Sequence, residues 1–249
     1  MARAALPGRL KWQLATVVEV VAETARASSI VLELPGWTPH HAGQHVDVRL
    51  TAEDGYQAQR SYSIASGPED GHLVLTVERL DDGEVSPYLV GELVPGDQLE
   101  LRGPIGGYFV WDQSRSEPVL MIAGGSGIVP FRSMLRHTTA IGSTTPIRLL
   151  YSARSIGEII YYDELLRLAS YEEIEIRFTL TRQWPKGWQG LRGRIDRPIL
   201  DAVSWAPDQQ PLIYVCGPSR FVETAAATLV ADGHKPAAIR TERFGPTGG

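Results

Sequence analysis

The sequence of 249 residues has almost no cysteine, no long apolar run and no excess of basic residues. Cys216 is the single cysteine, so this chain cannot form an internal disulfide, a CxxC redox centre or a four-thiolate iron–sulfur site. No apolar run reaches the roughly 18 residues that a membrane-spanning helix needs. The N-terminus has no apolar block of the signal-peptide type, and we therefore expect a cytoplasmic protein.

Charge and histidine content exclude two more classes of function. The formal net charge is −5, whereas a nucleic-acid-binding protein normally carries a basic excess in clusters. The six histidines are scattered, and the only adjacent pair, His40 and His41, lies in a turn without the helical spacing of a zinc site. We expect no nucleic-acid partner, no membrane and no metal site.

The first half of the chain predicts an antiparallel β-domain. Short segments rich in Val, Ile, Leu and Thr are separated by Gly, Pro and Asp turns, a spacing typical of a small barrel or sandwich. The only helix expected here covers residues 86–93, with Ser86 as N-cap and Pro87 in the first helical position. The expected strands are 13–21, 29–34, 45–50, 61–65, 72–80 and 98–102.

The second half predicts a parallel sheet with crossover helices. After Pro118, short apolar segments alternate with helical patterns of about ten residues. The expected strands are 119–123, 147–152, 174–181, 212–216 and 238–242, and the expected helices are 129–141, 161–170, 196–203 and 219–232. The polar stretch 112–117 is a suitable connection, so we expect domains at 10–112 and 117–249.

A strand, a glycine turn and a helix start follow one another in residues 120–131, Leu-Met-Ile-Ala-Gly-Gly-Ser-Gly-Ile-Val-Pro-Phe. Such an arrangement collects backbone N–H groups and the positive end of a helix dipole where a phosphate can bind. Taken alone, the stretch is equally compatible with a purely structural turn. Ligands of open parallel sheets bind beyond the carboxyl ends of the strands, where residues 124–127, 152–154, 181–182 and 216–218 all fall.

Arg60 and Tyr62 alternate along an expected strand and therefore share a face. A guanidinium group can bind a phosphate through two N–H groups, and a ring two residues further on offers a stacking surface. The pair suits a flavin nucleotide. It is also compatible with an edge strand that carries one solvated arginine.

Five motifs, in this order, resemble the ferredoxin-NADP reductase superfamily of flavoenzymes. They are Arg60-Ser-Tyr-Ser63, Gly103-Pro-Ile-Gly106, Gly124-Gly-Ser-Gly-Ile-Val-Pro-Phe131, Cys216-Gly-Pro218 and Glu242-Arg-Phe244. The resemblance covers nearly the whole chain. It implies an antiparallel flavin-binding β-barrel followed by an α/β parallel-sheet domain for a nicotinamide dinucleotide, the same two-domain fold that the strand and helix patterns predict.

The resemblance also implies FAD in the first domain, with Arg60 on the pyrophosphate, Tyr62 against the isoalloxazine and Ser63 near flavin N5. Residues 82–86, Asp-Gly-Glu-Val-Ser, resemble the Gly-Gly-x-x-Ser pyrophosphate loop of the family. Asp82 replaces the first glycine, which leaves the geometry of the loop open and FMN as an alternative. The implied flavin-binding residues are Arg60, Ser61, Tyr62, Ser63, Val77, Gly83, Val85 and Ser86.

In the second domain, the resemblance assigns the pyrophosphate of the nicotinamide dinucleotide to Gly124, Gly125, Ser126 and Gly127. It places Cys216, Gly217 and Pro218 beside the nicotinamide ring, with Phe244 packed near the flavin. Cys216 is also compatible with a small buried side chain at a strand end.

Three residues are candidates for catalytic roles: Ser63, Cys216 and Glu242. Ser63 and Glu242 are candidates for hydrogen bonding or proton relay near flavin N5, and Glu242 is alternatively an exposed charge near the C-terminus.

The adenosine end favours NADPH, with NADH possible. The second strand of the parallel sheet ends at Arg154 without an acidic residue, and the third ends at Thr181 and Arg182. A 2′-phosphate needs positive charge, which the two arginines supply, whereas an NADH site usually presents a carboxylate to the ribose. Either arginine is otherwise an exposed residue at a strand end.

The implied activity is hydride transfer from NAD(P)H to FAD, followed by electron transfer to an acceptor. Because this chain cannot hold a plant-type iron–sulfur cluster, we expect the acceptor to be separate, such as a ferredoxin or an oxygenase component. One alternative is a reductase of free flavin or another small acceptor. Another is a flavin-binding interaction subunit without catalytic activity.

Overall fold

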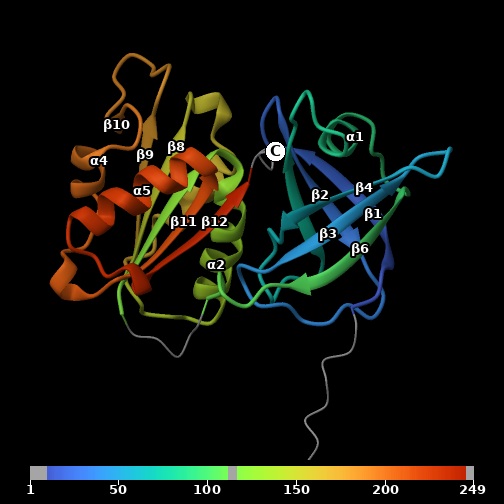
Figure 1. Ribbon diagram of the computed structural model, residues 1–249, viewed down its shortest axis with the longest axis horizontal. Coiled ribbons are helices and arrows are strands. Elements are labelled where there is room, and N and C mark those ends of the chain that lie inside the picture. Colours follow the sequence, from blue (N-terminus) through green and yellow to red (C-terminus); the bar gives the residue numbers. More distant parts are fainter. Residues whose placement is uncertain (1–9, 112–116, 245–249) are drawn as a thin grey trace, which may run out of the picture.

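A computed structural model describes residues 10–111 and 117–244, which form two six-stranded sheets (Figure 1). The first sheet has the strand order β4-β3-β6-β1-β2-β5 with antiparallel pairs, and the second has the order β10-β9-β8-β7-β11-β12 with parallel pairs. The two-domain fold expected from the sequence is thereby confirmed. The boundary expected at 112–117 falls mostly outside the described residues, as does the segment 245–249, and the domain limits remain a prediction.

The first sheet closes on itself as a barrel. An isolated bridge between Ile64, just after β4, and Leu75 of β5 joins the two edges of the sheet. Alternate residues point inward, and Val46 and Val48 of β3 are fully buried. The elements of this half are β1 (Gln13–Ala22), β2 (Ala27–Glu33), β3 (His45–Thr51), β4 (Gln57–Ser63), β5 (Leu73–Glu78), α1 (Ser86–Gly91) and β6 (Gln98–Ile105).

Strand β4 begins four residues earlier than the predicted strand 61–65. It pairs along the whole of β3, from Gln57 opposite Thr51 to Ser63 opposite His45. Most of its side chains are polar and exposed, so the hydrophobic pattern did not reveal its first half. The apolar residues that suggested the later position follow the strand and are buried in the closed barrel.

Helix α1 differs from the prediction at both ends. Its N-cap is Val85, one residue before the predicted Ser86, and it ends at Gly91. Pro87 lies in the first turn as expected. The Ser86 hydroxyl accepts a hydrogen bond from the Leu80 backbone N–H at 3.0 Å, so Ser86 closes the loop before the helix.

The second sheet is covered by helices on both faces. Its strands are β7 (Val119–Gly124), β8 (Ile147–Ala153), β9 (Ile174–Leu180), β10 (Leu191–Arg192), β11 (Leu212–Pro218) and β12 (Ile239–Phe244). The α-helices are α2 (Val129–Ala140), α3 (Tyr162–Leu168), α4 (Arg197–Asp201) and α5 (Ser219–Ala231), and short 3-10 helices include η1 (Gly125–Ile128) and η2 (Ile156–Glu158). Strand β10 has only two residues and was not predicted. Among the described residues, no helix is long and apolar enough to cross a membrane.

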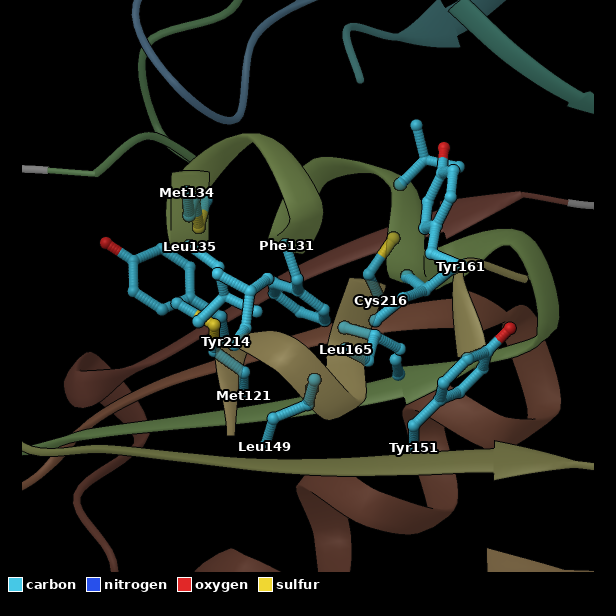
Figure 2. Packing of buried hydrophobic residues seen from close by; sticks show 14 of the residues in the cluster. Met121, Phe131, Met134, Leu135, Leu149, Tyr151, Tyr161, Leu165, Tyr214 and Cys216 are labelled. Atoms are coloured by element: carbon cyan, nitrogen blue, oxygen red, sulfur yellow. The ribbon is translucent and has the colours of Figure 1, made fainter. Parts of the chain in front are cut away.

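Strand β7 is buried along its whole length and separates two apolar layers. Met121 packs with α2 and α3 on one face, together with Leu135 and Leu165 (Figure 2). Leu120 points to the opposite face, where it packs with α4 and α5. Truncation of either β7 side chain to alanine would cost about 2–5 kcal/mol. This packing holds the carboxyl end of β7 in a fixed place.

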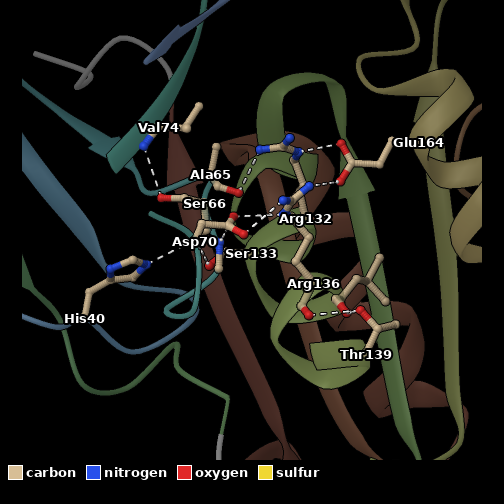
Figure 3. A network of polar contacts seen from close by, with 12 residues as sticks. His40, Ala65, Ser66, Asp70, Val74, Arg132, Ser133, Arg136, Thr139 and Glu164 are labelled. Carbon is tan, nitrogen blue, oxygen red and sulfur yellow. Dashed lines mark hydrogen bonds and ion pairs between the residues drawn. The ribbon is translucent and has the colours of Figure 1, made fainter. Parts of the chain in front are cut away.

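A polar network joins the two domains (Figure 3). Arg132 of α2 donates a hydrogen bond to the Ala65 carbonyl of the barrel at 3.1 Å, and Arg136 forms two hydrogen bonds of 2.9 Å with the Asp70 carboxylate. Glu164 of α3 accepts 2.8 Å hydrogen bonds from both arginines. Burial raises the pKa of Glu164, but the two guanidinium groups outweigh burial and hold that pKa below its usual value. The network therefore stays charged at neutral pH.

Candidate functional site

The glycine turn after β7 packs directly on the end of β11. A Cβ atom added to Gly127 would lie 2.2 Å from the Cys216 carbonyl oxygen, so no larger residue fits without moving the strand. Gly125 has φ of +56°, a conformation that favours glycine. A Cβ added to Gly124 would meet the Phe221 ring at 3.0 Å. Each of these glycines has a specific steric or conformational reason to be present.

The matching end of β11 is equally tight. A Cβ atom added to Gly217 would lie 2.8 Å from the Phe221 ring and 3.3 Å from the Gly124 Cα atom. The next residue, Pro218, is exposed and pairs with Phe244 of β12. Phe244 is half-buried against the apolar cluster that contains Cys216. The predicted glycine turn and the predicted nicotinamide-binding segment are therefore neighbours.

A carboxylate from the barrel is bound at the glycine turn. The backbone N–H of Ser126 donates to Oε2 of Glu78 at 3.2 Å, and a Cβ added to Gly125 would lie 3.4 Å from the same oxygen. Glu78 is the last residue of β5. Carboxylates and phosphates bind the same N–H groups at helix starts, so Glu78 lies where the sequence assigned a phosphate. Sequence reasoning missed Glu78 because the contact joins residues 48 positions apart.

Arg60 and the predicted pyrophosphate loop meet through a second carboxylate. The Arg60 guanidinium pairs with Glu84, which lies within residues 82–86. The Tyr56 hydroxyl donates to the other Glu84 oxygen at 2.6 Å. The hydrogen bond from Tyr56 and then that from Arg60 lower the pKa of Glu84. A pyrophosphate that binds Arg60 has to displace Glu84 or share the guanidinium with it.

The 82–86 loop is compact with Asp82 in place of glycine. The Gly83 N–H donates to the Leu80 carbonyl at 3.0 Å, and a Cβ added to Gly83 would lie 3.0 Å from the Ser86 hydroxyl. Val85 is fully buried in the barrel. Among the described residues, the non-glycine residues with positive φ do not include Asp82. The loop conformation therefore does not require glycine at that position.

Tyr62 shares a face of β4 with Arg60, as the alternation predicts, because their partners in β3 are the buried Val46 and Val48. Burial raises the pKa of Tyr62 to about 12. Val77 is buried in the same barrel cluster that Tyr62 packs against.

Ser61 points to the other face of β4. Its hydroxyl donates to Asp47 at 2.7 Å, and Arg102 donates to the same carboxylate at 2.6 Å. Ser61 is therefore held by side chains of the barrel itself.

The three candidate catalytic residues converge around His45. Ser63 lies opposite His45 in the β3–β4 ladder, and Cys216 lies opposite Glu242 in the β11–β12 ladder. His45 Nδ1 is 3.9 Å from Glu242 Oε1. One side-chain contact thus joins the strand position beside Ser63 in the barrel to the strand position beside Cys216 in the parallel sheet. Sequence reasoning missed His45, for which its place at the start of β3 was the only signal.

Burial controls the ionisation of this group. It raises the pKa of Glu242 to about 7, and Glu242 Oε2 is buried without a hydrogen-bond partner. Burial, together with the nearby Glu242, raises the pKa of the Cys216 thiol, which therefore stays protonated at neutral pH. Burial also lowers the pKa of His45. Acids whose pKa values are strongly shifted are typical of functional sites.

The two arginines predicted to bind the adenosine end of the coenzyme lie at one edge of the parallel sheet, where Arg154 follows β8 and Arg182 follows β9. The Arg154 carbonyl accepts a 3.0 Å hydrogen bond from the backbone N–H of Arg182, and the Thr181 N–H donates to the Ala153 carbonyl at 2.9 Å. Both arginine side chains are exposed. Glu158 Oε2 lies 4.0 Å from Arg154 Nε, a carboxylate that sequence reasoning did not consider. The edge therefore offers positive charge and one acidic group.

Comparison with known proteins supports these assignments of the two halves. Two family models match the chain, an oxidoreductase FAD-binding domain over residues 15–110 and an oxidoreductase NAD-binding domain over residues 121–227. Ferredoxin--NADP reductase B of Sorangium cellulosum is 36% identical over 187 residues, which cover 73% of this chain and 75% of that protein.

Two further relatives cover more of the chain. The glycine betaine monooxygenase reductase subunit of Chromohalobacter salexigens is 30% identical over 237 residues, covering 92% of this chain and 63% of that protein. This chain thus spans less than two thirds of the length of that subunit. The flavohem-like FAD/NAD-binding domain of nitric oxide dioxygenase from Vibrio cholerae has a TM-score of 0.84 and 25% identity, covering 94% of this chain and 99% of that chain.

Proposed function

Because this chain belongs to the ferredoxin-NADP reductase superfamily, we propose that it passes electrons from NADPH through FAD to a separate redox protein, a ferredoxin or an oxygenase component. The observation that carries the proposal is the convergence of Ser63 and His45 from the barrel with Cys216 and Glu242 from the parallel sheet. A site that draws on both domains is what a reaction between two bound nucleotides requires.

The residues present fit the two cofactors. Glu242 Oε2 is a buried oxygen without a partner, and the turn around Gly127 is a cradle that any Cβ atom would fill. When bound, the two cofactors supply hydride transfer. We propose that Arg60, Gly83 and Ser86 hold the flavin pyrophosphate. Tyr62, Ser63 and Val77 would contact the flavin ring.

The residues of the chain would bind and orient the two cofactors and exclude water from the space between them. The N–H groups of residues 124–127 would hold the dinucleotide pyrophosphate, and Cys216 and Phe244 would border the nicotinamide and flavin rings with apolar surface. The thiol of Cys216 is neutral and acts through its size. The α2 network with Asp70 keeps the two binding halves in register.

NADPH is the proposed coenzyme because Arg154 and Arg182 lie at the same sheet edge. A protein acceptor is proposed because the related proteins of Sorangium and Chromohalobacter are named as a ferredoxin–NADP reductase and as the reductase subunit of a monooxygenase. We also propose a cytoplasmic location.

An acceptor screen on the FAD-loaded protein tests the proposal. Oxidation of NADPH and of NADH would be followed with a ferredoxin, with free FMN and with an artificial dye as acceptors. We expect the protein to be yellow, to prefer NADPH and to reduce ferredoxin. Rapid reduction of free FMN without ferredoxin would contradict the proposed acceptor. A protein that stays colourless with added FAD would contradict the reductase and favour an interaction subunit.

A further inference from the structure

The outer face of β5 lies against the parallel-sheet domain. Leu75 and Val77 point into the barrel core, so Val74, Thr76 and Glu78 alternate with them on the outer face. Val74 packs against the apolar cluster that includes the buried side chains of α2. Glu78 is the last residue on this face, and the strand direction carries its carboxylate to the glycine turn after β7.

The backbone on either side of this carboxylate is fixed. Glu78 pairs with Ala27 at the end of the β2–β5 ladder, and the N–H of Arg79 donates to the Arg26 carbonyl at 2.7 Å. The side chain of Arg79 pairs with Asp81 at 3.4 Å and leaves Glu78 without a cation from its own segment. The Glu78 carboxylate is therefore free to leave the turn by side-chain rotation, without a change in the barrel backbone.

One contact holds the carboxylate at the turn. Within residues 10–111 and 117–244, the Ser126 N–H at 3.2 Å is its one hydrogen-bond donor, and no cationic side chain pairs with it. This distance is longer than the roughly 2.7–2.9 Å typical of a charged hydrogen bond. A ligand that accepts from several N–H groups of the turn has the advantage over a carboxylate held by one.

The carboxylate and a pyrophosphate need the same N–H groups. Both are anions that bind at a helix start, and the short η1 runs directly into the twelve-residue α2. Glu78 Oε2 lies 3.4 Å from the position that a Cβ atom of Gly125 would take, so the missing side chain keeps this approach open to an anion. Two anions side by side at the turn would repel each other, and the binding of one therefore excludes the other.

We propose that Glu78 is an internal competitor of the coenzyme: its carboxylate occupies the pyrophosphate position and has to leave before the dinucleotide binds. This inference rests on the proposed function. When only a fraction of the molecules is open to a ligand, the apparent affinity falls by that fraction. Glu78 thus weakens the binding of NADPH and NADP+ alike, and the oxidised coenzyme leaves the protein more readily after hydride transfer.

The test compares two probes by isothermal titration calorimetry on the FAD-loaded protein. NADP+ contains the pyrophosphate, whereas 2′-AMP contains the adenosine end without it. We expect E78Q and E78A to bind NADP+ about 2- to 30-fold more tightly than wild type, the range that an anion at a helix N-terminus accounts for. Both variants should bind 2′-AMP with the wild-type affinity. The exposed Glu19 of β1 provides the control variant E19Q, which should match wild type with both probes.

Three outcomes would overturn the competition. Equal affinity of wild type and both variants for NADP+ would show that Glu78 does not restrict the turn. Weaker binding of NADP+ by the variants would make Glu78 a residue that supports the coenzyme. An equal gain for NADP+ and 2′-AMP would show a general effect of charge or of structure, with no preference for the pyrophosphate.

The NMR signal of the Ser126 amide in isotope-labelled protein adds a readout that does not need the coenzyme. Loss of the carboxylate should shift this signal in E78A, and inorganic pyrophosphate should shift it at a lower concentration in E78A than in wild type. An unchanged signal with identical pyrophosphate titrations would contradict the competition. If wild type binds neither NADP+ nor 2′-AMP, the proposed function fails, and the pyrophosphate titration still tests Glu78.

Discussion

Replacement of Glu242 by glutamine should change how the stability of the fold depends on pH. The folded protein holds the pKa of Glu242 at about 7, against an ordinary value of 4.5. The unfolded chain therefore releases this proton near pH 4.5, whereas the folded chain keeps it until about pH 7. The stability that comes from the protonated carboxyl is complete below pH 4.5 and is lost as the pH rises toward 7.

The size of this effect follows from the shift. At about 1.4 kcal/mol for each pKa unit, the wild-type protein should lose up to about 3 kcal/mol between pH 4.5 and 7 relative to E242Q. The partial exposure of the side chain makes this an upper value. Glutamine leaves its own amide without a partner in the same place, but that cost is the same at every pH.

The assay is urea unfolding of both proteins, followed by tryptophan fluorescence at several pH values from 4.5 to 8. The difference in unfolding free energy should move in favour of E242Q as the pH rises, and the exposed-site control E172Q should show no such trend. A difference between wild type and E242Q that stays constant across this range would refute a buried, uncompensated carboxyl at this position.

Three other substitutions test the binding residues. Glu78→Gln should tighten NADPH binding by several-fold in fluorescence titrations, because it removes a negative charge from the turn that binds the pyrophosphate; unchanged or weaker binding would count against that site. Arg60→Ala should weaken FAD binding by about 10- to 100-fold in equilibrium dialysis, the loss expected for a charged hydrogen bond, whereas Glu84→Gln should not weaken it; equal losses in both would assign a structural role to the pair. Arg154→Ala or Arg182→Glu should raise the KM for NADPH more than that for NADH, and equal effects on both coenzymes would refute the proposed phosphate site.

The fold was predictable because its main signals are local. Strand β7 is apolar, ends at Gly124 and is followed by further glycines, a pattern typical of a buried parallel strand with a close turn. Strand β4 was misplaced because its exposed half carries no hydrophobic signal, and the two-residue β10 is too short to show a pattern.

The candidate site was predictable only in part. The motifs led to Ser63, Cys216 and Glu242. Ser63 is paired with His45 in the barrel, Cys216 is paired with Glu242 in the parallel sheet, and His45 lies 3.9 Å from Glu242. His45 and Glu78 were missed because their partners come from the other domain. A sequence pattern describes which residues belong to one element, whereas such contacts depend on how two separately folded halves come together.

The candidate reacting groups are divided between the two domains, so each domain corresponds to one subunit of a heterodimer with a shared site. Neither half contains a complete set of groups, so two separately produced halves should be inactive until they associate. The contact between Arg136 and Asp70 would then act as a docking contact, and its partly exposed ion pair would weaken as salt is added. Added salt would therefore lower the activity of the associated halves, although the reacting residues take no part in the ion pair between Arg136 and Asp70.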